Sequence, residues 1–357
     1  MSSNLKPTLA GYPDLVRGSF YRLAIVGAGT LKGKEVADVL QERNFPSSDV
    51  KLLDDEDALG RLESLKDEVT FIQSVRPEQF ERIDFTFFAA DLESTRKNWQ
   101  SARRAGSAIV DLSYGLEDEP GAVVRSPWVE RQLGLSFAPE LQPAPAVVAH
   151  PAAVVLSLVL LRAQKAGVIR RAVATVFEPA SEHGQKGMDE LHEQTVNLLS
   201  FQPQPKEVFD TQVAFNLVSR YGEQSVPPLA AIENRILKHY RLIAKDQIPA
   251  PALLLMQAPI FHGHLLAMHV ELERAIDLAG VSDCLSGDRV KITPEDDAPS
   301  NVNAAGQNDI LLSILPDSGA KNSFWVWAAW DNLRVAASTA VECAESMAAT
   351  RPRGKIQ

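Results

Sequence analysis

A glycine-rich turn near the start of the chain could bind the phosphates of a dinucleotide. The segment GAGTLKG follows a short apolar stretch and precedes a run typical of a helix. Small residues let the backbone approach a pyrophosphate, and the first turn of a helix supplies free N–H groups. The spacing is G-x-G-x-x-x-G, and a tight strand-to-helix turn without a ligand is the alternative. The predicted contacts are Gly27, Ala28, Gly29, Thr30 and Gly33.

An acidic run further along the chain would determine whether NAD or NADP is preferred. It closes the segment LLDDED and extends from Asp54 to Asp57. A carboxylate at the end of the second strand can accept a hydrogen bond from a ribose hydroxyl, whereas a 2′-phosphate needs Arg or Lys. The run therefore favours NAD over NADP, with Asp54 as the ribose contact. A solvated acidic loop is the alternative.

Two histidines are candidates for acid–base chemistry. His262 and His264 alternate in the segment FHGH and share one face of a predicted strand, while His269 falls on the opposite face. An imidazole can exchange a proton near neutral pH, although a hydrogen-bonded core histidine is the alternative. Two such side chains can also ligate zinc, but the sequence offers no clear third ligand. We therefore predict no metal.

The turn before the longest apolar run is a natural position for a nucleophile. The segment VVAHPAAVVL reads as the end of a strand, a proline turn and the start of a helix. The turn consists of His150, Pro151, Ala152 and Ala153, none of which carries a hydroxyl or a thiol. His150 would either replace the missing base or cap the helix.

The elements that would position these residues change character along the chain. In the first part, strands at 21–26, 49–53, 84–90 and 108–112 alternate with helical segments. This alternation predicts a doubly wound parallel sheet with right-handed crossovers. After a proline-rich stretch at 141–147, the pattern predicts a mostly antiparallel sheet with helices. Its elements are a helix at 155–166, strands at 172–178, 253–258, 265–272 and 323–330, a polar loop at 291–307 and a final helix at 333–347.

Composition and charge exclude several classes of partner. The 357 residues are enough for about two domains. A net charge of −10 without a basic stripe argues against nucleic acid and anionic membranes. The sequence shows neither a membrane span nor a signal peptide. Cys284 and Cys343 have no metal-like spacing, and a reduced, cytoplasmic setting fits them best.

Eight segments, taken in order, resemble the aspartate-semialdehyde dehydrogenase family. They are VGAGTLKGKEVADVLQERNFP, DFTFFAA, AGSAIVDLS, SEHGQKGMDEL, TQVAFNLV, APIFHGH, AAGQNDILLSI and WDNLRVAASTAVECAE. The resemblance covers nearly the whole chain. It implies a Rossmann-like dinucleotide-binding domain, residues 1–148, completed by residues 332–357. It also implies an α+β domain, residues 149–331, that carries the catalytic residues and pairs two subunits into a homodimer.

Members of that family interconvert aspartyl phosphate and its semialdehyde through a cysteine thioester, a step of amino-acid biosynthesis. Their nucleophile turn reads Asn-Pro-Asn-Cys-Ser-Thr, so Ala153 stands where the thiol should be. Neither Cys284 nor Cys343 is placed to substitute. The family's acid–base histidine matches His264. Its carboxylate-binding arginine matches Gln257, which cannot supply the charge.

The remaining substrate positions have become acidic. The phosphate-binding arginine falls at about Glu117, and the substrate-positioning glutamine is Glu178. These acids oppose an acyl phosphate; a pocket for a cationic ligand and a solvated surface are the alternatives. On the cofactor side, Ser181 and Gly184 match the loop that faces the nicotinamide, and Asp331-Asn332 matches the acid–amide pair before the last helix.

Three functions are consistent with this pattern, which is similar to a divergent family branch that lacks the cysteine. The first is an NAD-binding homodimer, a pseudoenzyme with a regulatory or scaffold role. The second is an active oxidoreductase on another carbonyl compound, with His264 as proton donor, because hydride transfer needs no nucleophile. The third is a scaffold without cofactor. The retained cofactor positions favour the first two, and the missing charged clamp favours the first.

Overall fold

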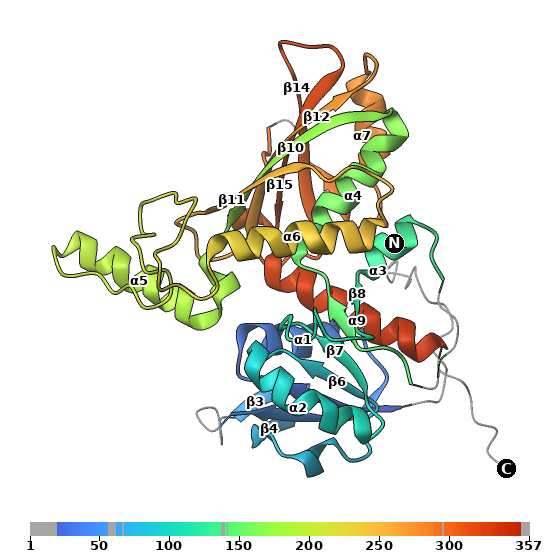
Figure 1. The fold of residues 1–357 in the computed structure, drawn as a ribbon, viewed down its shortest axis with the longest axis vertical. Coiled ribbons are helices and arrows are strands. Elements are labelled where there is room, and N and C mark those ends of the chain that lie inside the picture. The colour runs from blue at the N-terminus through green and yellow to red at the C-terminus, as the bar shows by residue number, and fades with distance from the viewer. Residues whose placement is uncertain are drawn as a thin grey trace, which may run out of the picture.

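Two domains meet at one long C-terminal helix in the computed structural model of the chain (Figure 1). The structure describes residues 20–55, 62–65, 68–136, 140, 142–294 and 296–350, with backbone alone at 62–65 and 68–70. Within these residues no helix combines the length and apolarity needed to cross a bilayer.

The first domain is built on a parallel sheet of seven strands in the order β5-β2-β1-β6-β7-β9-β8. Side chains of β1 alternate between the two faces, one covered by helices α1 and α9 and the other by α2. The doubly wound prediction is therefore confirmed. The strands are β1 (Tyr21–Val26), β2 (Ser47–Asp54), β5 (Gln73–Ser74), β6 (Phe85–Phe88), β7 (Ala108–Asp111), β8 (Val123–Arg125) and β9 (Ala146–Val148). The helices are α1 (Leu31–Glu42), α2 (Leu92–Arg104), α3 (Pro127–Gln132), the 3-10 turn η2 (Pro77–Phe80) and α9 (Asn332–Thr350). A separate antiparallel pair joins β3 (Leu62–Leu65) to β4 (Glu68–Phe71).

The second domain carries a mixed sheet of six strands in the order β11-β10-β12-β15-β14-β13. The inner pairings are antiparallel, as predicted, whereas β11 and β13 pair in parallel with their neighbours. The strands are β10 (Ile169–Glu178), β11 (Ala252–Gln257), β12 (His264–Leu272), β13 (Val290–Ile292), β14 (Ile310–Pro316) and β15 (Ser323–Trp330). The helices are α4 (Pro151–Ala166), η3 (Ala180–His183), α5 (Gly184–Leu199), α6 (Leu229–Ala244), α7 (Leu278–Leu285) and α8 (Asn301–Ala304).

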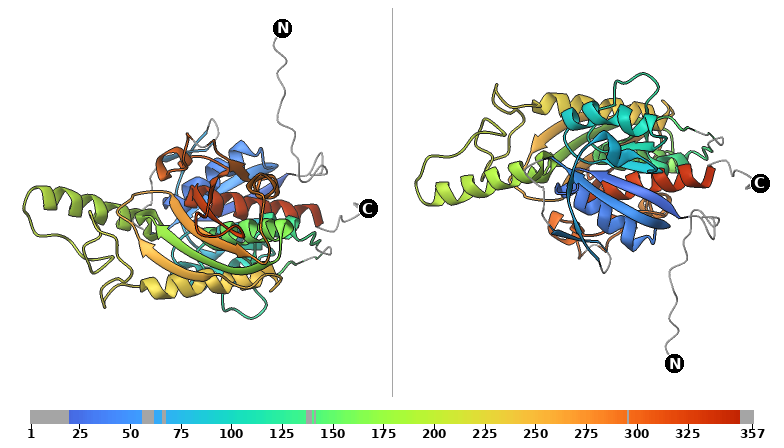
Figure 2. Two further views of the ribbon diagram at one scale, coloured as in Figure 1. Left: turned by 90° about the horizontal axis from the view of Figure 1, so that it is seen from above. Right: turned by 90° about the horizontal axis from the view of Figure 1, so that it is seen from below.

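Helix α5 and the loop that follows it project from the body of the molecule as an arm, residues 184–227 (Figure 2). Two buried side chains of α5 fix the loop. The Glu190 carboxylate accepts hydrogen bonds from the backbone N–H groups of Glu207 and Val208, and the Gln194 side chain bonds the backbone at Val213. The arm is therefore an ordered extension.

Two local expectations differ from the structure. The segment 291–307, predicted as a polar loop, contains the end of β13 and the short helix α8. A capping box formed by Ser300 and Asn303 starts that helix within a polar sequence. Cys284, expected after a helical stretch, lies inside α7.

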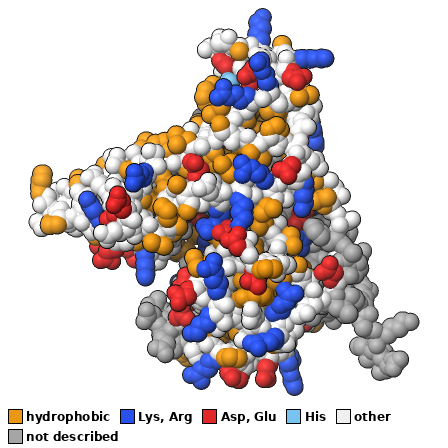
Figure 3. All heavy atoms as spheres, in the orientation of Figure 1, with side chains coloured by type: hydrophobic (Ala, Val, Ile, Leu, Met, Phe, Trp, Pro, Cys, Tyr) orange, Lys and Arg blue, Asp and Glu red, His pale blue; other side chains and the backbone are white. Residues whose placement is uncertain are grey.

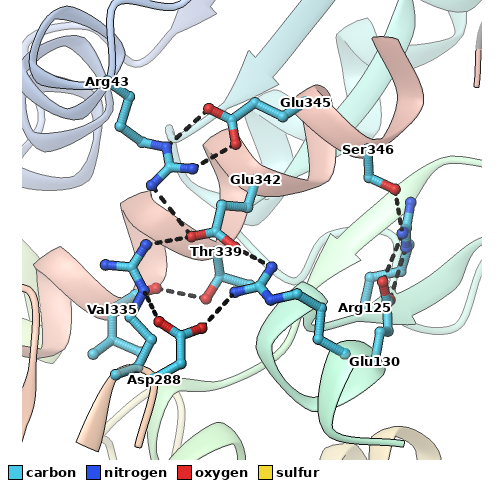
Figure 4. Close-up of polar contacts among 11 residues, drawn as sticks. Arg43, Arg125, Glu130, Asp288, Val335, Thr339, Glu342, Glu345 and Ser346 are labelled. Atoms are coloured by element: carbon cyan, nitrogen blue, oxygen red, sulfur yellow. Dashed lines mark hydrogen bonds and ion pairs between the residues drawn. The ribbon is translucent and has the colours of Figure 1, made fainter. Parts of the chain in front are cut away.

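A cluster of ion pairs fixes α9 to both domains (Figure 4). The Glu342 carboxylate, whose side chain is 1% exposed, lies 2.7 Å from Arg131 Nη1, 2.6 Å from Arg289 Nη2 and 3.4 Å from Arg43 Nη1. Glu345 accepts a bidentate bond from Arg43. The three arginines come from the end of α1, from α3 and from the residue before β13, so one helix collects charges from distant parts of the chain.

Candidate functional site

The glycine turn lies at the carboxyl end of β1 and opens α1. Thr30 caps the helix: its hydroxyl oxygen accepts from Gly33 N at 3.0 Å and the hydroxyl donates to Gly27 O at 2.7 Å. Gly27 has a φ of +85°, and a Cβ on it would lie 2.3 Å from Ala90 N. A Cβ on Gly33 would lie 2.0 Å from Gly27 O. Both glycines are therefore required by the turn, which brings its backbone close to any ligand at the strand end.

Asp54, the predicted ribose contact, ends β2 beside this turn. Its carboxylate accepts hydrogen bonds from Gly29 N at 2.7 Å and Asp55 N at 2.9 Å. Each carboxylate oxygen has a further lone pair that can accept a ribose hydroxyl. The glycine turn and the Asp54 carboxylate together are suited to bind a dinucleotide, the turn at its pyrophosphate and the carboxylate at a ribose hydroxyl. The rest of the acidic run, Glu56 and Asp57, lies outside the described residues.

The turn at the start of α4 lacks a nucleophile, and His150 caps the helix. Its Nδ1 accepts from Ala152 N at 3.2 Å, and its own backbone N–H donates to His239 Nδ1 at 3.0 Å. The Ala153 methyl group is completely buried. Burial in α9 raises the pKa of Cys343 to about 12, so that thiol is protonated and no substitute.

Gln257, which the family resemblance aligns with the carboxylate-binding arginine, makes all its side-chain hydrogen bonds within the protein. Its Nε2 donates to the carbonyl oxygens of Glu178 and Ala258, and its Oε1 accepts from the Tyr221 hydroxyl at 2.7 Å. Because the Tyr221 proton points to Gln257, the Tyr221 oxygen accepts from His183 Nε2 at 2.8 Å. Gln257 therefore offers no free group to a ligand.

Glu117 is neither solvated nor available to a cationic ligand. Its carboxylate forms a bidentate ion pair with Arg235 at 2.9 and 3.0 Å and lies 3.3 Å from His239 Nε2. Burial opposes its ionisation, but the hydrogen bonds from His239 and Arg235 prevail and lower its pKa to about 2. The Arg235 guanidinium also stacks over the Tyr114 ring. These contacts fix Glu117, Arg235 and Tyr114 beside the turn that starts α4.

The buried centre of the site is a cluster of Glu178, His264 and Glu182. His264 Nε2 lies 4.0 Å from Glu178 Oε2, and His264 Nδ1 lies 3.9 Å from Glu182 Oε1. Glu178 and His264 are completely buried, and none of their side-chain oxygens and nitrogens finds a hydrogen-bond partner among the described residues. The His264 ring stacks on Trp330. Burial lowers the pKa of His264 to about 4, so the imidazole is neutral at pH 7.

Two charged residues at this site, Glu182 and Lys32, were not predicted from the sequence. Glu182 accepts a hydrogen bond from Asn332 Nδ2 at 2.9 Å, and although burial opposes it, the charge of Lys32 and neighbouring groups lower its pKa to about 2. Lys32 belongs to the glycine turn, and its ammonium lies over the Tyr114 ring. Both residues stand inside the motifs GAGTLKG and SEHGQKG, which could have signalled them. The charge of Lys32, held in the first domain by Leu112 O and the Tyr114 ring, thus acts on Glu182 of the second domain.

The predicted nicotinamide-side residues come together around Asn332. Its Oδ1 accepts from Ser181 Oγ and from Gly263 N, both at 3.2 Å. His262 Nε2 lies 2.7 Å from Asp331 Oδ2; burial lowers its pKa, but the bond and charge of Asp331 outweigh burial and raise it.

Other predicted site residues have simpler settings. Gly184 starts α5 with a φ of +68°. On the opposite sheet face, His269 pairs with Asp317 at 2.9 Å. In the part of the chain that the structure describes, no three His, Cys, Asp or Glu side chains are grouped to hold a metal ion.

Comparisons with known proteins match both domains. The family model "Semialdehyde dehydrogenase, NAD binding domain" matches residues 22–135, and "Semialdehyde dehydrogenase, dimerisation domain" matches residues 160–335. A USG-1 protein homolog of Azotobacter vinelandii is 30% identical over 329 residues, covering 90% of this chain and 96% of that protein. An aspartate-semialdehyde dehydrogenase of Rickettsia bellii is 27% identical, covering 92% of this chain and 98% of its own. The structure of a probable aspartate-semialdehyde dehydrogenase from Pseudomonas aeruginosa superposes with a TM-score of 0.81 at 27% identity, covering 92% of this chain and 98% of that one.

Proposed function

Because the chain belongs to the semialdehyde dehydrogenase family, we propose that it is an NAD-binding member that cannot form the thioester of aspartate-semialdehyde dehydrogenase. One observation carries this proposal: the residue that the family resemblance aligns with the nucleophile is Ala153, a fully buried alanine in the first turn of α4. The setting of Gln257 supports it further, because this side chain is uncharged and its hydrogen bonds are made to Tyr221, Glu178 and Ala258.

Phosphate-dependent oxidation of aspartate semialdehyde tests the proposal directly. We expect a rate at least about 10³-fold below that of the Rickettsia bellii relative in the same assay, because losing a covalent nucleophile commonly costs more than that. Ala153→Cys restores a thiol but no carboxylate clamp, and it is expected to remain far below the relative. A wild-type rate comparable with the relative's would refute the proposal.

Calorimetric titration with oxidised and reduced NAD and NADP tests the cofactor. We expect NAD to bind about tenfold or more tightly than NADP, because the Asp54 carboxylate repels a 2′-phosphate. Asp54→Asn should narrow that preference, since Asn retains an oxygen for Gly29 N but loses the charge. Asp55→Asn, on the exposed neighbour, is the matched control. If no form of either dinucleotide binds, the glycine turn is architecture alone and the cofactor-free scaffold gains support.

We further propose a homodimer that forms through the second domain. The match to a dimerisation domain supports it, as do hydrophobic side chains left in solvent on the arm (Figure 3). Phe201 is 96% exposed, Phe215 66% and Val226 87%, although the loop that carries them is ordered by Glu190 and Gln194. Light scattering should give twice the chain mass of 39.0 kDa, and a monomer would contradict the proposal.

A second function, oxidoreduction of another carbonyl compound, is favoured by the state of His264. Both ring nitrogens are buried without a hydrogen-bond partner among the described residues, and one of them faces the Glu182 carboxylate at 3.9 Å. A ligand oxygen could use that nitrogen as its acid or base. We also propose the domain division at 148/149 and 331/332, and a cytoplasmic location, since neither cysteine is in a disulfide.

A further inference from the structure

We infer that Glu178 is a neutral carboxylic acid in the folded protein and that it feeds a proton through His264 to the oxygen of a carbonyl ligand. The ligand rests on the second proposed function, carbonyl oxidoreduction. The protonation of Glu178 does not, because it follows from the contacts of its carboxyl group.

The carboxyl group of Glu178 is poorly placed to carry a charge: burial outweighs the opposing effects of His183 and Lys32. It is 0% exposed at the end of β10, and neither oxygen accepts a hydrogen bond from a described residue. His183 Nε2 lies 3.6 Å from Oε1, but its proton goes to the Tyr221 oxygen. Ionisation of a buried carboxyl group without hydrogen-bond donors is strongly disfavoured, so the group keeps its proton. Burial accordingly raises the pKa of Glu178.

The charged groups around Glu178 are also compatible with its protonated form. The groups facing Glu178 are His183 and Glu182 from η3, Lys32 from the glycine turn, His264 from β12, and Tyr114 and Tyr221 from loops. The only permanent cation in this set is Lys32, and its charge is offset by the ionised Glu182. Glu182 repels a second negative charge on Glu178. A neutral Glu178 therefore leaves the cluster electrically balanced.

The two nitrogens of His264 face opposite ends of the cluster. Nε2 faces the Glu178 carboxyl at 4.0 Å, and Nδ1 lies 3.9 Å from Glu182, whose carboxylate accepts a hydrogen bond from Asn332. A proton on Nδ1 points toward Glu182, where the ligand oxygen would have to approach, and the lone pair on Nε2 points toward Glu178. A side-chain rotation of Glu178 that shortens the 4.0 Å distance by about 1 Å makes a hydrogen bond.

The transfer balances at His264, which gives one proton to the ligand and receives one from Glu178. The Nδ1–H bond of His264 breaks as the ligand oxygen forms its O–H bond, and the O–H bond of Glu178 breaks as Nε2–H forms. His264 ends neutral, in its other tautomer, and Glu178 ends as a carboxylate. The electron pair for the carbonyl carbon comes from a hydride donor of the reduced-nicotinamide class. The family's glutamine at this position has no proton to give, so Glu178 makes the relay specific to this chain. Glu178 is thus a positioning residue that acts through His264.

Glu178→Gln separates an acid from an isosteric amide. Infrared spectroscopy at pH 7 should show a protonated carboxyl C=O band in the wild type that is missing in Glu178→Gln.

The pH dependence of folding stability gives a second test of the protonation of Glu178. The folded pKa lies above the ordinary 4.5, so this acid stabilises the fold fully below pH 4.5 and loses that contribution as pH rises through the folded pKa. Relative to Glu178→Gln, the folding equilibrium constant of the wild type should fall about tenfold per pH unit in that window.

Nitrogen NMR of labelled histidine tests the coupling to His264. The His264 signals should shift as Glu178 titrates above pH 4.5, and Glu178→Gln should abolish that step. Glu182→Gln should retain it, because the pKa of Glu182 is about 2 and its titration ends below that window.

The inference is overturned if the carboxyl band is absent or Glu178→Gln is the less stable protein throughout pH 5 to 8. A retained His264 step in Glu178→Gln also refutes the relay. If band and step are both present, the proton relay is supported, and failure of NADH-dependent reduction across small aldehydes and ketones then refutes carbonyl reduction separately.

Discussion

Glu342→Ala is expected to lower the free energy of unfolding by about 3 kcal/mol. Removing one partner of a buried ion pair leaves uncompensated charge, and here a single carboxylate is shared by Arg43, Arg131 and Arg289. The side chains of these arginines are 17 to 29% exposed, which lets water relieve part of the cost. Urea unfolding followed by circular dichroism measures the change.

Asp288→Ala is the matched control for that experiment. Asp288 contacts two of the same arginines, Arg131 at 3.2 Å and Arg289 at 3.9 Å, but its side chain is 63% exposed. Exposed ion pairs contribute about 1 kcal/mol or less, so this variant should remain close to the wild type. Equal losses in Glu342→Ala and Asp288→Ala would show that burial of the Glu342 carboxylate has no special weight.

Gly33→Ala is expected to abolish dinucleotide binding and to destabilise the first domain. The new Cβ would lie 2.0 Å from Gly27 O and 2.8 Å from Gly27 C, all backbone atoms, so the turn itself must move. Overpacking of this kind costs about 1–3 kcal/mol, and the displaced backbone loses its approach to a pyrophosphate. Thermal unfolding and NAD calorimetry report the two effects separately.

Gly280→Ala provides the comparison for Gly33→Ala. Gly280 lies in α7, where the nearest atom to an added Cβ is Asp277 Oδ2 at 3.9 Å. Replacing a helical glycine by alanine there should be neutral or slightly stabilising. Unchanged NAD affinity and stability in Gly33→Ala would mean that the turn adapts freely and that its close packing is not required.

The fold was accessible from the sequence because its main elements carry strong local signals. The apolar run Tyr21–Val26 before the glycine turn and the alternation of His264–Leu272 give strands with the predicted bounds or nearly so. Shorter pieces such as α3 and β13 were missed, because six or three residues are too few for a periodic pattern. The parallel pairing of β11 depends on sheet order, which no local pattern encodes.

The site was only partly accessible, because its chemistry depends on partners distant in sequence. His264 and Asp54 could be named as candidates from their motifs, and the structure shows His264 buried beside Glu178 and Asp54 bonded to Gly29 N. Glu117 could not be interpreted, because its partner Arg235 lies 118 residues away. The engagement of Gln257 by Tyr221 likewise depends on a loop without a recognisable pattern.

Because α9 follows the second domain in the sequence, the first domain is completed only late in translation. The first sheet is complete when β9 emerges at Val148, but the helix that covers one of its faces begins at Asn332. About 180 residues intervene, and at roughly 5–20 residues per second their synthesis takes on the order of ten to forty seconds. During that time the apolar face that α9 will cover lacks its partner helix, and transiently exposed apolar surface of this kind promotes aggregation.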